Sequence, residues 1–225
     1  MLPLSRQIHA MFGEIDIYVF DQLLKGRFDS ARRVLDAGCG EGRNLHFLLQ
    51  SGRECFGIDR TPAAVDEIRA LAARLAPDLP ATNFVTGELD ALPWPDRHFD
   101  VVICSAVLHF ARDEAHFDRM VSEMWRVLAR GGVFFARLAS IYPTAGTPAP
   151  RLAPHLAGAP APRSGSSHQE AGRRIRTPDG AERFVVDEAM LMDRTSQLDG
   201  ALLDPIKTTV VQQQRAMTTW VVRKG

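Results

Sequence analysis

The sequence predicts a single-domain α/β fold in which a mainly parallel sheet carries helices on both faces. Short apolar segments alternate with segments of helical periodicity from residue 33 to residue 138, and this alternation is typical of parallel strands joined by right-handed crossovers. The apolar segments are nearly continuous, as expected of strands that are covered on both sides. With 225 residues, the chain is long enough for one domain with an ordinary core.

The predicted strands are short apolar runs bounded by turn residues. Five precede residue 140, and two follow an irregular segment near the C-terminus. The short link at 214–216 between the last two strands predicts an antiparallel hairpin. The predicted strands cover residues 33–37, 54–59, 83–86, 99–104, 133–138, 206–213 and 217–222.

The helices are predicted from apolar residues at helical spacing and from residues that favour a helix start. Pro62 stands at a first helical position, and Asp113 and Asp187 can cap the helices that follow them. Residues from about 5 to 25 predict one or two amphipathic helices within an N-terminal cap (1–28). Further helices are predicted at 44–50, between Thr61 and Pro77, and after each of the two capping aspartates.

Residues from about 140 to 182 are rich in Pro, Gly, Ser and Arg and show no periodicity. We expect a long, mobile insertion outside the core, which can cover a site at the carboxyl edge of the sheet. Its arginines either recognise an anionic substrate or belong to a solvated loop. These arginines are Arg163, Arg173, Arg174 and Arg176.

The composition excludes several classes of protein. Basic and acidic residues number 27 each, and this balance favours neither nucleic acid nor a membrane surface as a partner. Cys39, Cys55 and Cys104 are unclustered, which argues against a disulfide framework or a zinc site and fits a reducing compartment. No apolar run approaches the roughly 18 residues that span a bilayer, and the first six residues lack the charged start and apolar core expected of a signal peptide. We expect a cytoplasmic protein without a metal.

A glycine-dense turn follows the first predicted strand, in the run Val-Leu-Asp-Ala-Gly-Cys-Gly-Glu-Gly-Arg from Val34 to Arg43. Glycines allow the backbone to approach a ligand without Cβ clashes. Asp59 ends the next apolar run about 20 residues later, where a carboxylate can accept hydrogen bonds from two ribose hydroxyls. The pattern predicts a site for a nucleoside-containing cofactor at the sheet edge. A plain strand-to-helix turn without a ligand is the alternative.

The glycine spacing favours one cofactor over another. The dinucleotide fingerprint is G-x-G-x-x-G/A, whereas this chain has Gly38-x-Gly40-x-Gly42 with Arg43 at the last small position. S-adenosylmethionine (SAM) has a ribose and an adenine but no pyrophosphate, and its amino-acid tail carries a carboxylate that a guanidinium suits. Arg43 either pairs with that carboxylate or is a solvated helix residue.

The run D-A-G-C-G-E-G from Asp36 to Gly42 resembles motif I of the class I SAM-dependent methyltransferases. The likeness extends over residues 34–138 and is greatest to the small-molecule branch called methyltransferase type 11. It implies a Rossmann-like seven-stranded sheet of order 3-2-1-4-5-7-6 with strand 7 antiparallel, within a methyltransferase domain at 29–225. It also implies SAM as the cofactor, a small-molecule methyl acceptor and transfer by in-line displacement.

The resemblance implies a set of cofactor-binding residues. Asp36 and the glycine loop would hold the methionine end, Asp59 the ribose, and Glu88 and Leu89 the adenine, with Glu88 in place of the usual Asp. The backbone after the fourth strand would face the amino group. The implied cofactor-binding residues are Asp36, Gly38, Cys39, Gly40, Arg43, Asp59, Arg60, Glu88, Leu89, Cys104 and Ser105.

His109 is the one candidate for a catalytic residue, because it follows the fourth strand on the side where substrates would enter. It either acts as a general base or substrate contact, or packs at a helix start. Methyl transfer from an activated sulfonium needs little beyond positioning and water exclusion, so a missing dyad is no objection. Two rivals remain: an NAD(P)-linked oxidoreductase, against which Arg43 and the absence of a Tyr-x-x-x-Lys dyad argue, and a non-catalytic SAM-binding protein.

Overall fold

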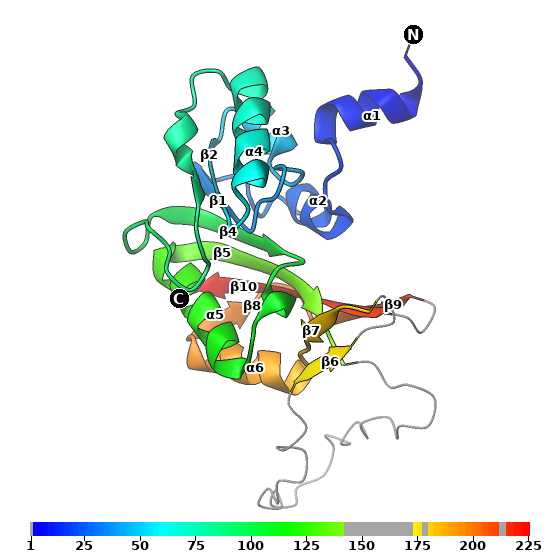
Figure 1. Cartoon of the computed structure of the whole chain (residues 1–225), viewed down its shortest axis with the longest axis vertical. Coiled ribbons are helices and arrows are strands. Elements are labelled where there is room, and N and C mark those ends of the chain that lie inside the picture. Colours follow the sequence, from blue (N-terminus) through cyan, green and yellow to red (C-terminus); the bar gives the residue numbers. More distant parts are fainter. Residues whose placement is uncertain (1, 142–172, 177–179, 212–214) are drawn as a thin grey trace, which may run out of the picture.

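The structure is a computed structural model of the whole chain, and it describes residues 2–141, 173–176, 180–211 and 215–225. One sheet runs through the molecule in the order β3-β2-β1-β4-β5-β10-β8, and β9 also pairs with β10 (Figure 1). The strands are β1 (Arg33–Ala37), β2 (Glu54–Asp59), β3 (Phe84–Thr86), β4 (Phe99–Ser105), β5 (Leu128–Ala139), β8 (Gly200–Leu202), β9 (Lys207–Val211) and β10 (Arg215–Lys224).

The predicted strand order is confirmed, with one difference at the far edge. The first five strands pair in parallel and β10 pairs antiparallel with β5, as expected for strand 7. The place of strand 6 is shared by two short strands: β9 pairs with residues 215–219 of β10, and β8 pairs with residues 222–224. The segment at 200–202 has only three residues, too few to show a strand pattern in the sequence.

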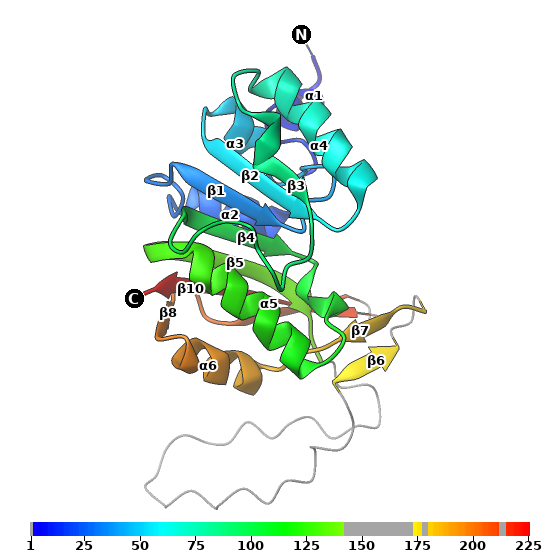
Figure 2. The same cartoon turned by 60° about the vertical axis from the view of Figure 1, so that its left-hand side comes forward.

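Helices cover both faces of the sheet (Figure 2). α5 (Glu114–Val127) and α6 (Glu188–Gln197) contribute to one core cluster, and α2 (Ile17–Leu24), α3 (His46–Gln50) and α4 (Pro62–Leu75) to the other. Alternate strand residues divide between the clusters: Leu35 belongs to the first and Val34 to the second. The continuous apolar runs therefore arise because both sides of each strand are buried.

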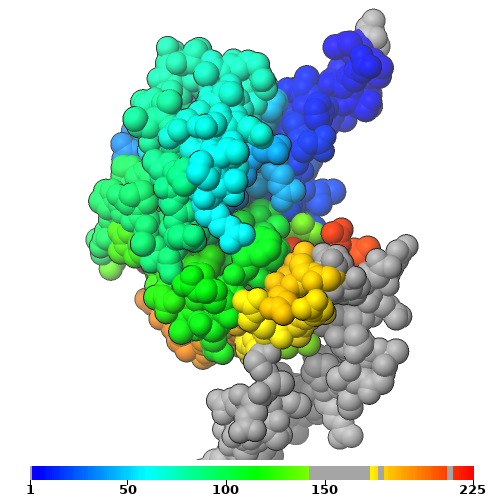
Figure 3. Space-filling view, in the orientation of Figure 1, coloured from blue at the N-terminus to red at the C-terminus, as the bar shows by residue number. Residues whose placement is uncertain are grey.

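The helix starts agree with the predicted signals. Pro62 begins α4, and the side chains of Asp113 and Asp187 accept hydrogen bonds from the backbone N–H groups of His116 and Met190. The predicted N-terminal helical region consists of α1 (Leu4–Phe12) and α2. α1 has no buried residue and projects from the surface in Figure 3.

The prediction for residues 140–182 is corrected at its C-terminal end. There β6 (Arg174–Arg176) forms a two-stranded antiparallel sheet with β7 (Glu182–Phe184). No apolar alternation marks these strands, because β6 is exposed and its charged side chains pair across the hairpin, Arg174 with Glu182 at 2.9 Å. Residues 142–172 and 177–179 of the insertion, with Arg163 and the mobility predicted for them, lie outside the described residues.

Candidate functional site

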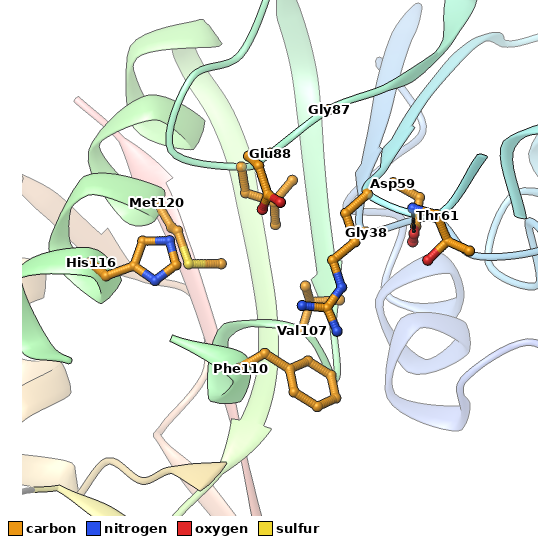
Figure 4. A pocket seen from close by; sticks show the side chains of 11 residues that line it. Gly38, Asp59, Thr61, Gly87, Glu88, Val107, Phe110, His116 and Met120 are labelled. Carbon is orange, nitrogen blue, oxygen red and sulfur yellow. Dashed lines mark hydrogen bonds between the residues drawn. The ribbon is translucent and has the colours of Figure 1, made fainter. Parts of the chain in front are cut away.

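A cavity of about 240 Å³ opens at the carboxyl ends of β1 and β2, between them and α5 (Figure 4). Side chains from the loops after β2, β3 and β4 and from the first turns of α5 converge on it. In an open parallel sheet, ligands bind beyond this edge. The lining residues are Gly38, Asp59, Arg60, Thr61, Gly87, Glu88, Leu89, Val107, Phe110, His116 and Met120.

Asp59 connects the two loops on one side of the cavity. Its Oδ2 accepts a hydrogen bond from the backbone N–H of Gly40 at 3.1 Å, and its Oδ1 accepts one from Thr61 at 2.9 Å. Each carboxylate oxygen can accept a second bond. The carboxylate is therefore held in place by the backbone and still has lone pairs for a ligand's hydroxyl groups.

The three loop glycines have different reasons to be glycine, although all have positive φ. A Cβ at Gly38 would lie 2.4 Å from Cγ2 of Val107, and one at Gly42 would lie 2.0 Å from Cδ1 of Ile68 in α4. A Cβ at Gly40 would meet nothing within 4 Å. Packing within the protein thus explains Gly38 and Gly42, whereas Gly40 borders open space beside Asp59 that a ligand can use.

Asp36 lies at the end of β1 and is fully buried. No donor among the described residues reaches either carboxylate oxygen in hydrogen-bonding geometry. Burial raises the pKa of Asp36 to about 7, and the side chains of Asn44 and Arg43 oppose that shift only in part. Such a carboxyl suits a positively charged ligand group, because a cation beside it would lower its pKa and stabilise the ionised form.

The loop after β3 carries Glu88, exposed at the cavity, and Leu89, buried beneath it. α5 holds this loop: Glu123 accepts a hydrogen bond from the N–H of Leu92 at 2.9 Å, and Arg126 donates to the carbonyl of Leu92 at 3.0 Å. The hydrogen bond from Arg126 holds the pKa of Glu123 below its ordinary value. The position of Glu88 thus depends on a helix that is remote in sequence.

The side chains of Arg60, from the loop after β2, and Phe110, from the loop after β4, meet at the cavity. The guanidinium of Arg60 lies 5.6 Å from the ring centroid of Phe110, which is 46% exposed. This is within the range of a cation–π contact. Arg60 and Phe110 can therefore cover a flat ring bound between the loops after β2 and β4.

Strand β4 ends at Ser105, and this end is tied to the N-terminal region. The Ser105 hydroxyl donates to Oδ2 of Asp16 at 2.8 Å, and Arg43 donates to the Ser105 hydroxyl at 3.2 Å. Arg43, with a side chain 44% exposed, also lies 3.6 Å from Asp16. Arg43 is thus directed at the end of β4, beside the glycine loop, rather than into solvent alone.

His109 lies in a short 3-10 helix (Leu108–Phe110), is 5% exposed, and does not line the cavity. His116, which sequence reasoning missed, does line it. Its Nδ1 accepts a hydrogen bond from the N–H of Arg112 at 3.1 Å, and its Nε2 lies 3.4 Å from Asp90. Burial, aided by Arg112 and Arg119, lowers the pKa of His116. Met120, one turn further along α5, was also missed, because both residues carry the same helical spacing as the core face.

All three cysteines are free and buried. Burial raises the pKa of the Cys55 thiol to about 12 and also raises that of Cys104, so neither is an activated nucleophile. The part of the chain that the structure describes has no group of three metal-binding side chains. Nor is any of its helices long and apolar enough to cross a bilayer.

Comparisons with known proteins agree with this geometry. Residues 35–136 match the family model described as "Methyltransferase domain" of the methyltransferase type 11 group. A probable S-adenosylmethionine-dependent methyltransferase of Mycolicibacterium smegmatis is 38% identical over 105 residues, which are 47% of this chain and 37% of that protein. The matched segment thus spans well under half the length of this curated relative.

Solved structures resemble the whole chain. The 1,6-didemethyltoxoflavin-N1-methyltransferase of Burkholderia thailandensis, solved with S-adenosylhomocysteine, has a TM-score of 0.64 at 17% identity, with 98% of this chain and 82% of that chain covered. The [4+2]-cyclase SpnF has a TM-score of 0.63 at 18% identity, covering 91% of this chain and 80% of that one. At these identities, the likeness establishes the fold, which hosts more than one reaction.

The fold, the motif order and the family match agree with one another. Residues 35–136 match the methyltransferase domain family of the type 11 group, and the strand order is that expected of a class I SAM-dependent methyltransferase.

Proposed function

We propose that the protein is a SAM-dependent methyltransferase that transfers a methyl group to a small-molecule acceptor. The observation that carries the proposal is the position of Asp59, which is fixed by the backbone of Gly40 and Thr61 and directed at the cavity. A carboxylate held in this way is suited to a ribose. The family match at 35–136 supports the same assignment.

Residues suited to bind both the adenosine part and the methionine tail of SAM lie at this edge of the sheet. Asp59 would accept hydrogen bonds from the ribose hydroxyls, and the Glu88–Leu89 loop would bind the adenine, with the contacting pair Arg60 and Phe110 beside it. The buried carboxyl of Asp36 would serve the ammonium of the methionine tail, and Arg43 its carboxylate. Cys39 and Cys104 would contribute backbone groups, and Ser105 would orient Arg43.

Bound SAM supplies a methyl group on a sulfonium that is already activated. The chain must therefore position the acceptor and exclude water, and a base is needed only if the acceptor must lose a proton. His109 remains the proposed residue for that step. We further propose that residues 1–28 act as a cap on the acceptor side, that 29–225 form the catalytic domain, and that the protein works in the cytoplasm without a nucleic-acid or membrane partner.

Calorimetry with SAM, S-adenosylhomocysteine and NAD tests the cofactor. We expect a dissociation constant in the micromolar range for SAM, about −8 kcal/mol, and no comparable binding of NAD. A screen of small-molecule acceptors with labelled SAM then tests transfer. A preference for NAD would overturn the proposal in favour of an oxidoreductase. SAM binding without transfer to any acceptor class would favour a non-catalytic SAM-binding protein.

A further inference from the structure

A row of polar side chains crosses the sheet beneath the start of α2. Ser105 in β4 pairs with Arg137 in β5, Arg137 pairs with Thr219 in β10, and Thr219 pairs with Lys207 in β9. Paired residues on neighbouring strands point to the same face of a sheet. The four side chains therefore form one polar row on a face that elsewhere carries apolar residues such as Val133.

Asp16 and Tyr18, at the start of α2, cover this row. Asp16 accepts a hydrogen bond from Nη1 of Arg137 at 3.0 Å, and the Arg137 guanidinium lies 4.8 Å from the centroid of the Tyr18 ring. The ammonium of Lys207 lies 5.6 Å from the same centroid. Two cations thus share one aromatic ring, which attracts positive charge but does not neutralise it.

Asp16 is the one carboxylate that the described residues place against these cations. The guanidinium of Arg43 also lies 3.6 Å from Asp16, so Arg43, Arg137 and Lys207 carry three positive charges against its single negative charge. No carboxylate of the described residues lies within ion-pair distance of Lys207. In addition, Nε of Arg137 is buried and donates no hydrogen bond. The site therefore has a surplus of two positive charges and a buried donor without an acceptor. With Arg43 assigned to the methionine tail, a bound monoanion would satisfy the remaining charge and the buried donor.

The row lies outside the cavity proposed for the cofactor. The cavity is lined from β1, α5 and the loops after β2, β3 and β4, and none of its lining residues belongs to β5, β9 or β10. β5 is two strands from β1, about 10 Å away at the usual strand spacing. Arg137 also lies two residues from the carboxyl end of β5, at the same edge as the cavity. The row therefore lies at the same edge of the sheet as the cofactor cavity, on the face that α2 covers, whereas α5 covers the other face.

We propose that the methyl acceptor carries a carboxylate, and that Arg137 and Lys207 bind it beneath Tyr18. The inference rests on the proposed methyl transfer for the role of the ligand, but not for its binding. A guanidinium suits a carboxylate because it offers several N–H donors in one plane. A guanidinium also suits the carboxylate of the methionine tail. The experiment must therefore distinguish the carboxylate of the acceptor from that of the cofactor.

The test uses the full chain saturated with S-adenosylhomocysteine and two matched probes, benzoate and benzamide. Saturation-transfer NMR should detect benzoate but not benzamide. Arg137→Gln should weaken benzoate binding at least about tenfold, Lys207→Gln should weaken it about threefold, and both should keep the affinity for S-adenosylhomocysteine within about twofold. Arg223→Gln, an exposed arginine of β10 at the opposite edge, is the control and should change neither ligand.

Several results would overturn the proposal. If Arg137→Gln loses S-adenosylhomocysteine and keeps benzoate, the carboxylate bound there belongs to the methionine tail and the proposal is wrong. Equal binding of benzoate and benzamide, or tighter binding of phenyl phosphate than of benzoate, would also overturn it. Should Arg137→Gln not fold, the exposed Lys207→Gln and the conservative Arg137→Lys carry the test. Failure of S-adenosylhomocysteine to bind the wild-type protein would contradict the proposed function, and benzoate would then be tested alone.

Discussion

The carboxyl edge of the sheet has two halves with opposite charge. Over β1 and β2 the strands end in two carboxylates, the buried Asp36 and the cavity-lining Asp59, beside a glycine loop. Over β5 and β9 the polar groups are the cations Arg137 and Lys207, covered by an aromatic ring. A cationic, hydroxyl-bearing ligand suits the first half, and an anionic ligand suits the second. We therefore expect cofactor and acceptor to be distinguished by charge as well as by shape.

Substitution of the loop glycines should give the largest effects. It should also distinguish a glycine that packing within the protein requires from one that ligand binding requires. Gly38→Ala combines a positive φ with a Cβ 2.4 Å from Val107, so we expect a loss of about 2–5 kcal/mol in the free energy of unfolding. Gly40→Ala has room around it and should cost about 1 kcal/mol while weakening SAM binding. Chemical denaturation and calorimetry measure both quantities. Equal loss of stability in the two variants would contradict this distinction.

Asp59→Ala should weaken SAM binding by about 1–3 kcal/mol, because two ribose hydroxyls would lose a charged acceptor. The fold should survive, since Asp59 stands at a strand end and is only partly buried. Calorimetry on the folded variant measures the change, with circular dichroism as the control for folding. Unchanged affinity would remove Asp59 from the site.

Asp36 should make SAM binding depend on pH. Its pKa of about 7 means that the unliganded protein holds the carboxyl protonated below neutrality. If the bound ammonium requires the ionised form, affinity should rise about tenfold from pH 6 to pH 8, with release of a proton. Calorimetry in buffers of different ionisation enthalpy detects that proton, and Asp36→Asn should remove the dependence.

The same group affects stability with the opposite sign. The unfolded chain ionises Asp36 near its ordinary pKa of 3.8, whereas the folded chain does so at about 7. The unliganded protein therefore binds more protons when folded, and Asp36 should lower its stability as pH rises from about 4 to about 7. Denaturation of the wild type and Asp36→Asn across this range measures the difference. A difference that grows toward pH 4 would contradict it.

The smallest effect is expected from the pair that covers the cavity. Phe110→Ala removes the ring beneath Arg60 and should weaken SAM binding by about 0.5–1 kcal/mol, a typical contribution of an exposed cation–π contact. Phe110→Trp should restore most of it. Calorimetry of the two variants measures the change, and a loss in Phe110→Trp as large as that in Phe110→Ala would assign the effect to local disruption.

Much of the fold could be predicted because its signals are local. The five parallel strands, the capped helices and the antiparallel hairpin each carry apolar periodicity or a turn residue. Each lies within a residue or two of its predicted place, with one exception. Strand β5 begins at Leu128 rather than near Val133, because Gly131 and Gly132 lie within the strand instead of in a turn before it. The β6–β7 hairpin could not be predicted, since charge pairing rather than burial accompanies it. β8 was too short to give a pattern.

The two halves of the carboxyl edge also differ in whether their residues could be found from the sequence. Asp36, Asp59 and the glycines follow strands in a recognisable order, so they could be found from the sequence. Arg137 and Lys207 belong to strands 70 positions apart in the chain, and only the register of β5, β10 and β9 brings them to one row. His116 was hidden in the same way, because a histidine on the inner face of a helix carries no local signal of a cavity.

A crystal structure of the complex with S-adenosylhomocysteine tests the division of this edge most directly. We expect both ribose hydroxyls to lie within hydrogen-bonding distance of Asp59, the ammonium to lie beside Asp36, and Arg137 to keep its contact with Asp16. A complex in which the homocysteine carboxylate displaces Asp16 and binds Arg137 would contradict this expectation.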